Sequence, residues 1–204
     1  MSEADPRNLA DAHTQQPSLA GRKAIVTGGT TGIGRAIAVL LASEGAKVFV
    51  CGRTPAHLDD ALQRIREVGE GDGINVDLSR REDVEKFYDA ADRFLGGLDI
   101  AVTNAAIPAE ALTDSGKGET LYEIAVDFTS YLATTQAAVE RMKASSDVIL
   151  IGSMSAVSQK PGSSIYVAAK TGIEGFGPSL RKELPERDIK VGLIEPGFTG
   201  ADFQ

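Results

Sequence analysis

The sequence predicts a doubly wound α/β sheet, and three features of its pattern indicate this fold class. Short β-branched runs alternate with amphipathic stretches from Leu19 onward. The alternation repeats five times, which is typical of parallel strands joined by right-handed crossover helices. Glycines and polar residues cluster directly after the predicted strands. Because open α/β sheets bind ligands outside the carboxyl ends of their strands, this clustering predicts a ligand site along one edge of the sheet.

Each predicted element has its own pattern. Buried apolar runs predict strands at Lys23–Thr27, Lys47–Cys51, Ile74–Asp77, Leu98–Thr103, Asp147–Gly152 and Ile189–Ile194. Amphipathic periodicity predicts helices between them at Gly34–Ser43, Pro55–Val68, Arg81–Phe94, Thr120–Lys143 and Ser164–Leu184. Pro55 suits the first turn of a helix, and Ser79 precedes the acidic first turn of another.

Composition disfavours several classes of function. The 204 residues are 42% apolar and 25% charged, which is typical of a globular domain. A net charge of −8 without a basic tract disfavours nucleic acid and anionic lipid as partners. The longest apolar stretch, Ala36–Ala42, is too short to span a membrane. One cysteine and two histidines disfavour a metal site, so we predict none.

Residues 1–18 differ from the rest of the chain. They are polar, carry Pro6 and Pro17 and show no sustained periodicity, so we expect a disordered extension. Residues 19–204 are then expected to form one domain. Because no secretion signal precedes the first predicted strand, we expect a cytoplasmic protein.

A glycine-rich segment follows the first predicted strand. It reads Thr27-Gly28-Gly29-Thr30-Thr31-Gly32-Ile33-Gly34 and leads into a helix. These glycines let the backbone approach a ligand closely, and the helix start presents unpaired N–H groups that suit a pyrophosphate. The alternative is a structural turn without a ligand. The position between a strand and a helix favours nucleotide binding.

Arg53 and Thr54 follow the second predicted strand. Arg53 stands where a dinucleotide fold places the residue that reads the adenosine ribose. An acidic residue there binds the ribose 2′-hydroxyl, whereas a guanidinium, helped by the Thr54 hydroxyl, suits a 2′-phosphate. The alternative is a solvated surface arginine. We therefore predict NADP(H) as the preferred cofactor, with NAD(H) as the second option.

Tyr166 and Lys170 lie four residues apart in a predicted helix, so their side chains share one face. A neighbouring ammonium and an oxidised nicotinamide favour phenolate and lower the tyrosine pKa, which permits proton exchange with a carbonyl oxygen. Ser153 follows the fifth strand, where its hydroxyl can bind a developing alkoxide. Ser155 is the competing serine, and an ordinary helix-surface pair is the alternative for Tyr166 and Lys170.

Over Leu19 to Gln204 the chain resembles the short-chain dehydrogenase/reductase family. The matching elements are Thr27-Gly28-x-x-x-Gly32-x-Gly34, Asp77-Leu78, Asn104-Ala105-Ala106, Ser153, Tyr166-x-x-x-Lys170 and Pro196-Gly197. The resemblance implies a Rossmann-type sheet of strand order 3-2-1-4-5-6. It also implies an NAD(P)-dependent oxidoreductase that interconverts a ketone or aldehyde and an alcohol, with the hydride chemistry supplied by the cofactor.

The resemblance implies a role for each matching position. Tyr166 is the general acid/base, Ser153 orients the substrate oxygen, and Lys170 binds the nicotinamide ribose and lowers the tyrosine pKa. Cofactor contacts are also implied at Asp77 and Leu78 near the adenine, at Asn104, Ala105 and Ala106 beside the central strands, and at Pro196, Gly197 and Thr199 near the nicotinamide. Arg53 is similar to the residue of NADP-preferring members.

The chain departs from the family pattern at three places. The usual Asn-Ala-Gly turn ends in Ala106. The family's fourth catalytic residue, an asparagine, aligns with Asp127, which either preserves a proton relay through Lys170 or overstabilises its ammonium; a solvent-facing aspartate is the further alternative. Family members also continue past Pro-Gly through a substrate-covering segment to a seventh strand. Because the sequence stops at Gln204, we expect a fragment, and the alternative is a naturally short form.

Two classes of function stay open at this level. The first is the oxidoreductase, acting on a small carbonyl or alcohol substrate whose identity the sequence does not reveal. The second is a non-catalytic NAD(P)-binding protein that senses redox state or regulates a partner, which Asp127 and the early end at Gln204 favour. The resemblance also suggests a homodimer or homotetramer packed through the two longest predicted helices.

Overall fold

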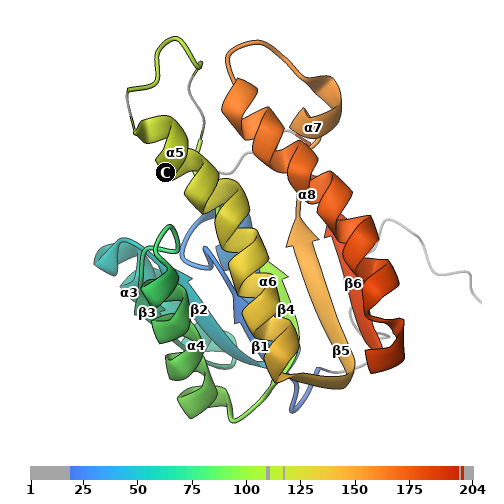
Figure 1. Cartoon of the computed structure of the whole chain (residues 1–204). Coiled ribbons are helices and arrows are strands. Elements are labelled where there is room, and N and C mark those ends of the chain that lie inside the picture. Colours follow the sequence, from blue (N-terminus) through green and yellow to red (C-terminus); the bar gives the residue numbers. More distant parts are fainter. Residues whose placement is uncertain (1–18, 109–110, 117, 198, 200–204) are drawn as a thin grey trace, which may run out of the picture.

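The computed structural model describes residues 19–108, 111–116, 118–197 and 199, and these residues form a layered α/β fold (Figure 1). Within them, parallel strands build one six-stranded sheet of order β3-β2-β1-β4-β5-β6. The predicted fold class and strand order are confirmed. The predicted disordered extension, residues 1–18, lies outside the described residues.

Most strands lie where the apolar runs predicted them. The strands are β1 (Lys23–Val26), β2 (Lys47–Gly52), β3 (Glu70–Asn75), β4 (Leu98–Thr103), β5 (Met142–Ile151) and β6 (Ile189–Ile194). In β1, Ala24, Ile25 and Val26 are all nearly inaccessible, because helices cover both faces of the sheet. Burial on both faces explains why this strand is continuously apolar rather than alternating.

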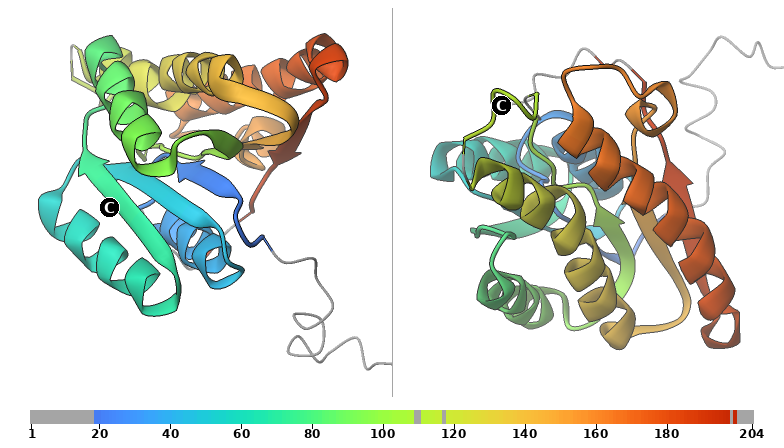
Figure 2. Two further views of the ribbon diagram at one scale, coloured as in Figure 1. Left: turned by 90° about the horizontal axis from the view of Figure 1, so that it is seen from below. Right: turned by 45° about the horizontal axis from the view of Figure 1, so that its top comes forward.

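Helices cover the two faces in separate groups (Figure 2). One face carries α2 (Gly32–Ser43) and α3 (Pro55–Val68), and the other carries α4 (Arg81–Leu95), α6 (Ser130–Arg141) and α8 (Ser164–Glu183). Alternate residues of the strands divide between two apolar cores, with Val26 facing the first group and Ile25 the second. This arrangement leaves the carboxyl ends of the strands uncovered by those helices, as a doubly wound sheet requires for a ligand site.

The third strand lies earlier than the sequence predicted, at Glu70–Asn75 instead of Ile74–Asp77. Its glycines fit it there, because a Cβ atom on Gly71 would overlap Ile65 of α3. A Cβ atom on Gly73 would lie 2.6 Å from the carbonyl oxygen of Val50 in β2. Close approach of neighbouring elements to bare backbone therefore sets this strand, and local β-propensity does not.

The long helix predicted at Thr120–Lys143 is interrupted. The structure has α5 (Glu119–Ile124), a π-helical turn η1 (Ala125–Thr129) and α6, and β5 already begins at Met142. In η1, Phe128 packs against α8 so closely that a Cβ atom on Gly172 would lie 2.6 Å from its ring. Single π turns inside helices often occur at functional sites. Here the turn carries Asp127, whose side chain is fully buried.

Short elements complete the described chain. They are α7 (Ser155–Ser158) and the 3₁₀ turn η2 (Pro185–Arg187), neither of which the sequence predicted. The predicted helix at Ser164–Leu184 is confirmed as α8, which continues through Pro178. The described helices include none with the length and apolar character needed to cross a membrane.

Candidate active site

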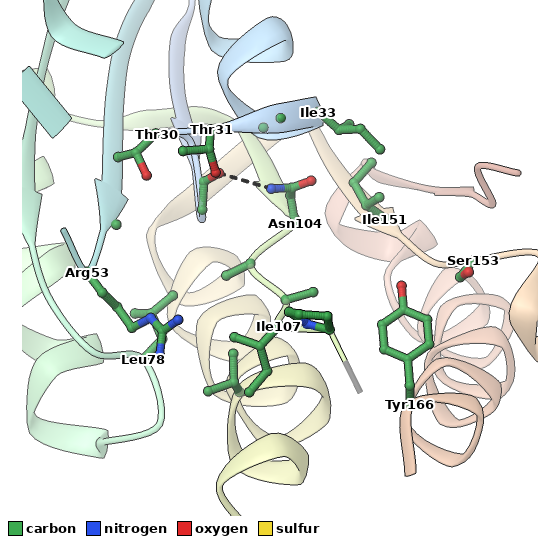
Figure 3. A pocket seen from close by; sticks show the side chains of 18 of the residues that line it. Thr30, Thr31, Ile33, Arg53, Leu78, Asn104, Ile107, Ile151, Ser153 and Tyr166 are labelled. Atoms are coloured by element: carbon green, nitrogen blue, oxygen red, sulfur yellow. Dashed lines mark hydrogen bonds between the residues drawn. The ribbon is translucent and has the colours of Figure 1, made fainter. Parts of the chain in front are cut away.

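A cleft of about 430 Å³ lies at the carboxyl ends of the strands, where the pattern predicted a ligand site. Figure 3 shows Arg53 and Tyr166 on opposite sides of this cleft, with Asn104 between them. The predicted site residues that line it are Gly28, Thr30, Thr31, Gly32, Ile33, Gly34, Arg53, Thr54, Asp77, Leu78, Asn104, Ala105, Ala106, Ser153, Tyr166, Lys170, Pro196, Gly197 and Thr199. Tertiary structure thus brings residues from almost the whole domain to one elongated groove.

The glycine-rich loop has the geometry of a phosphate cradle. Gly28 and Gly32 adopt φ angles of +62° and +52°, which disfavour any side chain. The loop leads into α2, and Thr31 at its N-cap makes no capping hydrogen bond to a described residue. The first N–H groups of α2 therefore stay available to an anion in the cleft, reinforced by the helix dipole. On these observations the loop fits the pyrophosphate of a dinucleotide.

Thr27 supports this loop rather than lining the cleft. Its hydroxyl oxygen accepts hydrogen bonds from the backbone N–H of Asn104 at 2.9 Å and of Ala105 at 3.2 Å. The Asn104 side-chain amide in turn donates to the carbonyl oxygens of Thr27 at 3.0 Å and Gly28 at 3.2 Å. Thr27 is 1% exposed and is not among the residues that line the cleft, so the structure places it behind the loop, and its predicted contact with a cofactor stays a prediction.

Ser153 and Tyr166 meet at one end of the cleft. The Ser153 side chain interacts with the Tyr166 hydroxyl, and this interaction opposes the rise in the Tyr166 pKa that burial causes. The Ser153 hydroxyl also accepts the backbone N–H of Ser155 at 3.1 Å, which fixes its position at the start of α7. Of the two candidate serines, Ser153 is therefore the one that contacts the phenol.

Lys170 is held by two further partners that the sequence did not predict. Its ammonium donates to the Tyr131 hydroxyl at 2.9 Å and to the carbonyl oxygen of Ile151 at 3.2 Å. The Lys170 nitrogen lies 5.5 Å from the centre of the Tyr166 ring. Burial lowers the Lys170 pKa from its ordinary 10.5 to about 8, against the attraction of Asp127. Burial raises the Tyr166 pKa, so the lowering that the sequence predicted from Lys170 together with an oxidised nicotinamide stays a prediction.

Tyr131 is a site residue that the motifs missed. Its hydroxyl accepts from Lys170 and donates to the carbonyl oxygen of Ile151 at 2.9 Å, so it fixes the ammonium at the end of β5. It stands four residues after Asp127, on the helix that follows η1. That spacing was the only indication of it in the sequence.

Asp127 is buried behind the cleft and does not line it. The alternative of an aspartate that faces solvent is therefore excluded. One carboxyl oxygen accepts the backbone N–H of Ile107 at 2.8 Å, and the other has no hydrogen-bond partner among the described residues. Burial raises the Asp127 pKa to about 7, against that N–H and the charge of Lys170. Near neutral pH the carboxyl thus keeps much of its proton and, like an amide, can both donate and accept.

Glu123 adds a second buried carboxyl on α5, one helical turn before Asp127. It is 5% exposed, and one of its oxygens has no hydrogen-bond partner within the described chain. Burial raises the Glu123 pKa, and its charge contributes to the raised pKa of Asp127. In the described residues no three His, Cys, Asp or Glu side chains gather to hold a metal ion.

Comparisons with known proteins agree with this geometry. The sequence profile of the family described as short chain dehydrogenase matches residues 22–204. Carbonyl reductase family member 4 of Danio rerio is 33% identical over 89% of this chain and 77% of its own. The 3-oxoacyl-(acyl-carrier-protein) reductase FabG of Haemophilus influenzae is 34% identical over 91% of this chain and 77% of its own.

Solved structures show the same likeness. A dehydrogenase/reductase from Sinorhizobium meliloti 1021 superposes with a TM-score of 0.86 at 32% identity, over 92% of this chain and 76% of its own. A short chain dehydrogenase from Burkholderia cenocepacia J2315 in complex with NADP superposes with a TM-score of 0.87 at 29% identity, over 92% of this chain and 78% of its own. The chain belongs to the short-chain dehydrogenase/reductase family. It is an NAD(P)-dependent oxidoreductase of that family.

Proposed function

We propose that this oxidoreductase uses NADP(H) to interconvert a ketone or aldehyde and an alcohol, with Tyr166 as the general acid/base. The observation that carries the proposal is that Ser153 and Tyr166 interact and line the same cleft as the glycine-rich loop. The names of two relatives, a carbonyl reductase and an oxoacyl reductase, support the substrate class. The neighbour solved with NADP supports the cofactor.

The chain offers a cofactor site along the whole cleft. When bound, NADP(H) supplies or accepts the hydride. The start of α2 and the glycines before it suit the pyrophosphate, and the guanidinium of Arg53 suits a 2′-phosphate. Pro196, Gly197 and Thr199 also line the cleft, and the family resemblance implies that they lie near the nicotinamide.

The proton chemistry belongs to the side chains. In the reductive direction Tyr166 donates its proton to the carbonyl oxygen, while the Ser153 hydroxyl stabilises the developing alkoxide. The charge of Lys170 favours the phenolate that results, once the site is filled and drier. Asp127, with a pKa of about 7, can give up its proton toward Lys170 near neutral pH and is then protonated again, so it supports a relay that returns a proton to the Tyr166 phenolate.

The test combines turnover with cofactor binding. We expect oxidation of NADPH, followed at 340 nm, with at least one member of a panel of small ketones and aldehydes. Tyr166→Phe should lower kcat by about 10²- to 10⁴-fold while NADPH binding, measured by calorimetry, stays within about two-fold. NADPH binding without consumption across the panel would instead support the non-catalytic redox-sensing alternative.

Assembly and location stay predictions. The expected homodimer or homotetramer is tested by light scattering of the full chain after size-exclusion chromatography, where a monomer would contradict it. The cytoplasmic location is tested by fractionation of cells that express the natural gene.

A further inference from the structure

We propose that Tyr122 determines cofactor preference by holding Arg53 in position for a 2′-phosphate. The proposal rests on the proposed function, because it assumes that the adenosine end of a dinucleotide lies beside Arg53. Tyr122 belongs to α5, whereas Arg53 follows β2, so the two come together only in the folded chain. None of the motifs in the sequence includes Tyr122.

Tyr122 stands between a cation and a carboxylate. The Arg53 guanidinium donates from Nη1 to the Tyr122 hydroxyl oxygen at 2.5 Å and lies 5.8 Å from the centre of its ring. The Tyr122 hydroxyl donates in turn to Oδ2 of Asp77 at 3.2 Å. The phenol is thus an acceptor toward the arginine and a donor toward the carboxylate, which links three side chains in one chain of hydrogen bonds.

Asp77, at the far end of this chain, is itself fixed. Its second carboxyl oxygen accepts the backbone N–H of Ser79 at 3.0 Å. Its own backbone N–H donates to Asp83 in α4 at 3.0 Å. Because both the carboxyl group and the backbone N–H of Asp77 are held by hydrogen bonds, the Asp77 carboxylate has a fixed position. It can therefore orient the Tyr122 hydroxyl and, through it, Arg53. Burial also raises the Tyr122 pKa, so the hydroxyl keeps the proton that this arrangement needs.

This geometry favours a 2′-phosphate in two ways. A guanidinium has five N–H donors. The hydrogen bond from Nη1 to Tyr122 uses one of them, so the others can bind a phosphate on the cleft side. Ordering a long side chain is unfavourable, and an arginine that is already held loses less freedom on binding. The phenol also separates Arg53 from Asp77. Without its hydroxyl, the carboxylate can pair with the guanidinium directly and draw it away from the phosphate.

Tyr122→Phe tests the proposal because it keeps the ring and removes only the hydroxyl. In the full chain, calorimetry should show the Kd for NADPH and for 2′,5′-ADP rising by about three- to ten-fold, the loss expected for one hydrogen bond. The Kd for NADH, which lacks the 2′-phosphate, should change less than about two-fold. Leu121→Ala, on the same helix and 75% exposed, is the matched control and should leave all three values unchanged.

A double-mutant cycle separates positioning from a general structural effect. In an Arg53→Gln background, Tyr122→Phe should have no further effect on NADPH binding, because the group it positions is gone. Equal losses for NADPH and NADH, or a loss that persists without Arg53, would overturn the proposal. Failure of the proposed function looks different: the unsubstituted chain would then bind NADPH no more tightly than NADH, or bind neither.

Discussion

Asp127→Asn isolates the energetic effect of the buried carboxyl at the centre of the site. The substitution keeps the shape of the side chain, and the amide oxygen can still accept the N–H of Ile107. It removes the ionisable group, which has one oxygen without a hydrogen-bond partner among the described residues. The asparagine is also the residue that the family resemblance leads one to expect here, so the fold should accommodate it.

The size of the effect follows from the Asp127 pKa. Burial raises this pKa from 3.8 to about 7, so ionising the carboxyl in the folded state costs about 4 kcal/mol more than in the unfolded state. A raised folded-state pKa favours the fold at low pH, and that contribution is lost as the pH rises from about 4 to about 7. The asparagine of Asp127→Asn does not ionise, so this variant does not lose stability in this way as the pH rises. Its advantage in free energy of unfolding should therefore grow from roughly 2 kcal/mol at pH 5.5 to roughly 4 kcal/mol at pH 8.

Urea unfolding of the cofactor-free protein, followed by circular dichroism at several pH values, measures this difference. Asp89→Asn, on the exposed side of α4, is the matched control for the substitution itself. A difference between Asp127→Asn and the unsubstituted protein that stays constant from pH 5.5 to pH 8 would refute the reasoning, because it would mean that the carboxyl does not change its charge over this range.

Two further predictions concern Gly34 in α2 and Cys51 in β2. Gly34→Ala should destabilise the fold by about 1–3 kcal/mol and weaken NADPH binding, because its Cβ atom would overlap the Gly28 carbonyl oxygen and the Asn104 side chain. Thermal unfolding and calorimetry measure both effects, and Gly175→Ala, whose Cβ atom would meet no heavy atom within 4 Å, is the control; equal behaviour of the two variants would contradict the prediction. Cys51 is 1% exposed, and burial raises its thiol pKa to about 12, so iodoacetamide at pH 8 should leave it unmodified until urea is added. Mass spectrometry checks this, and rapid labelling of the folded protein would show that β2 opens or is less buried than described.

Much of the candidate site could be predicted from the sequence, because its residues follow the ends of parallel strands. Gly28, Arg53 and Ser153 each come within two residues of a strand end, and the doubly wound fold brings those ends to one edge. Helical spacing placed Tyr166 and Lys170 on one face, and Ser153 after the fifth strand together with the family resemblance favoured them as site residues. The local sequence pattern, together with the rule that ligands bind at the carboxyl ends of parallel strands, was sufficient to predict that Gly28, Arg53 and Ser153 belong to the site.

The remaining features depend on packing between distant segments. The glycines of β3 form a strand because α3 and β2 approach their backbone, and η1 interrupts a helix where Phe128 meets Gly172. Tyr131 reaches Lys170 across 39 residues, and Tyr122 reaches Arg53 across 69. The sequence alone therefore determined the fold class, the phosphate loop and the residues proposed for the chemistry. Only the tertiary structure decided which side chains hold those residues in place, because such contacts arise from burial and close packing between segments that are far apart along the chain.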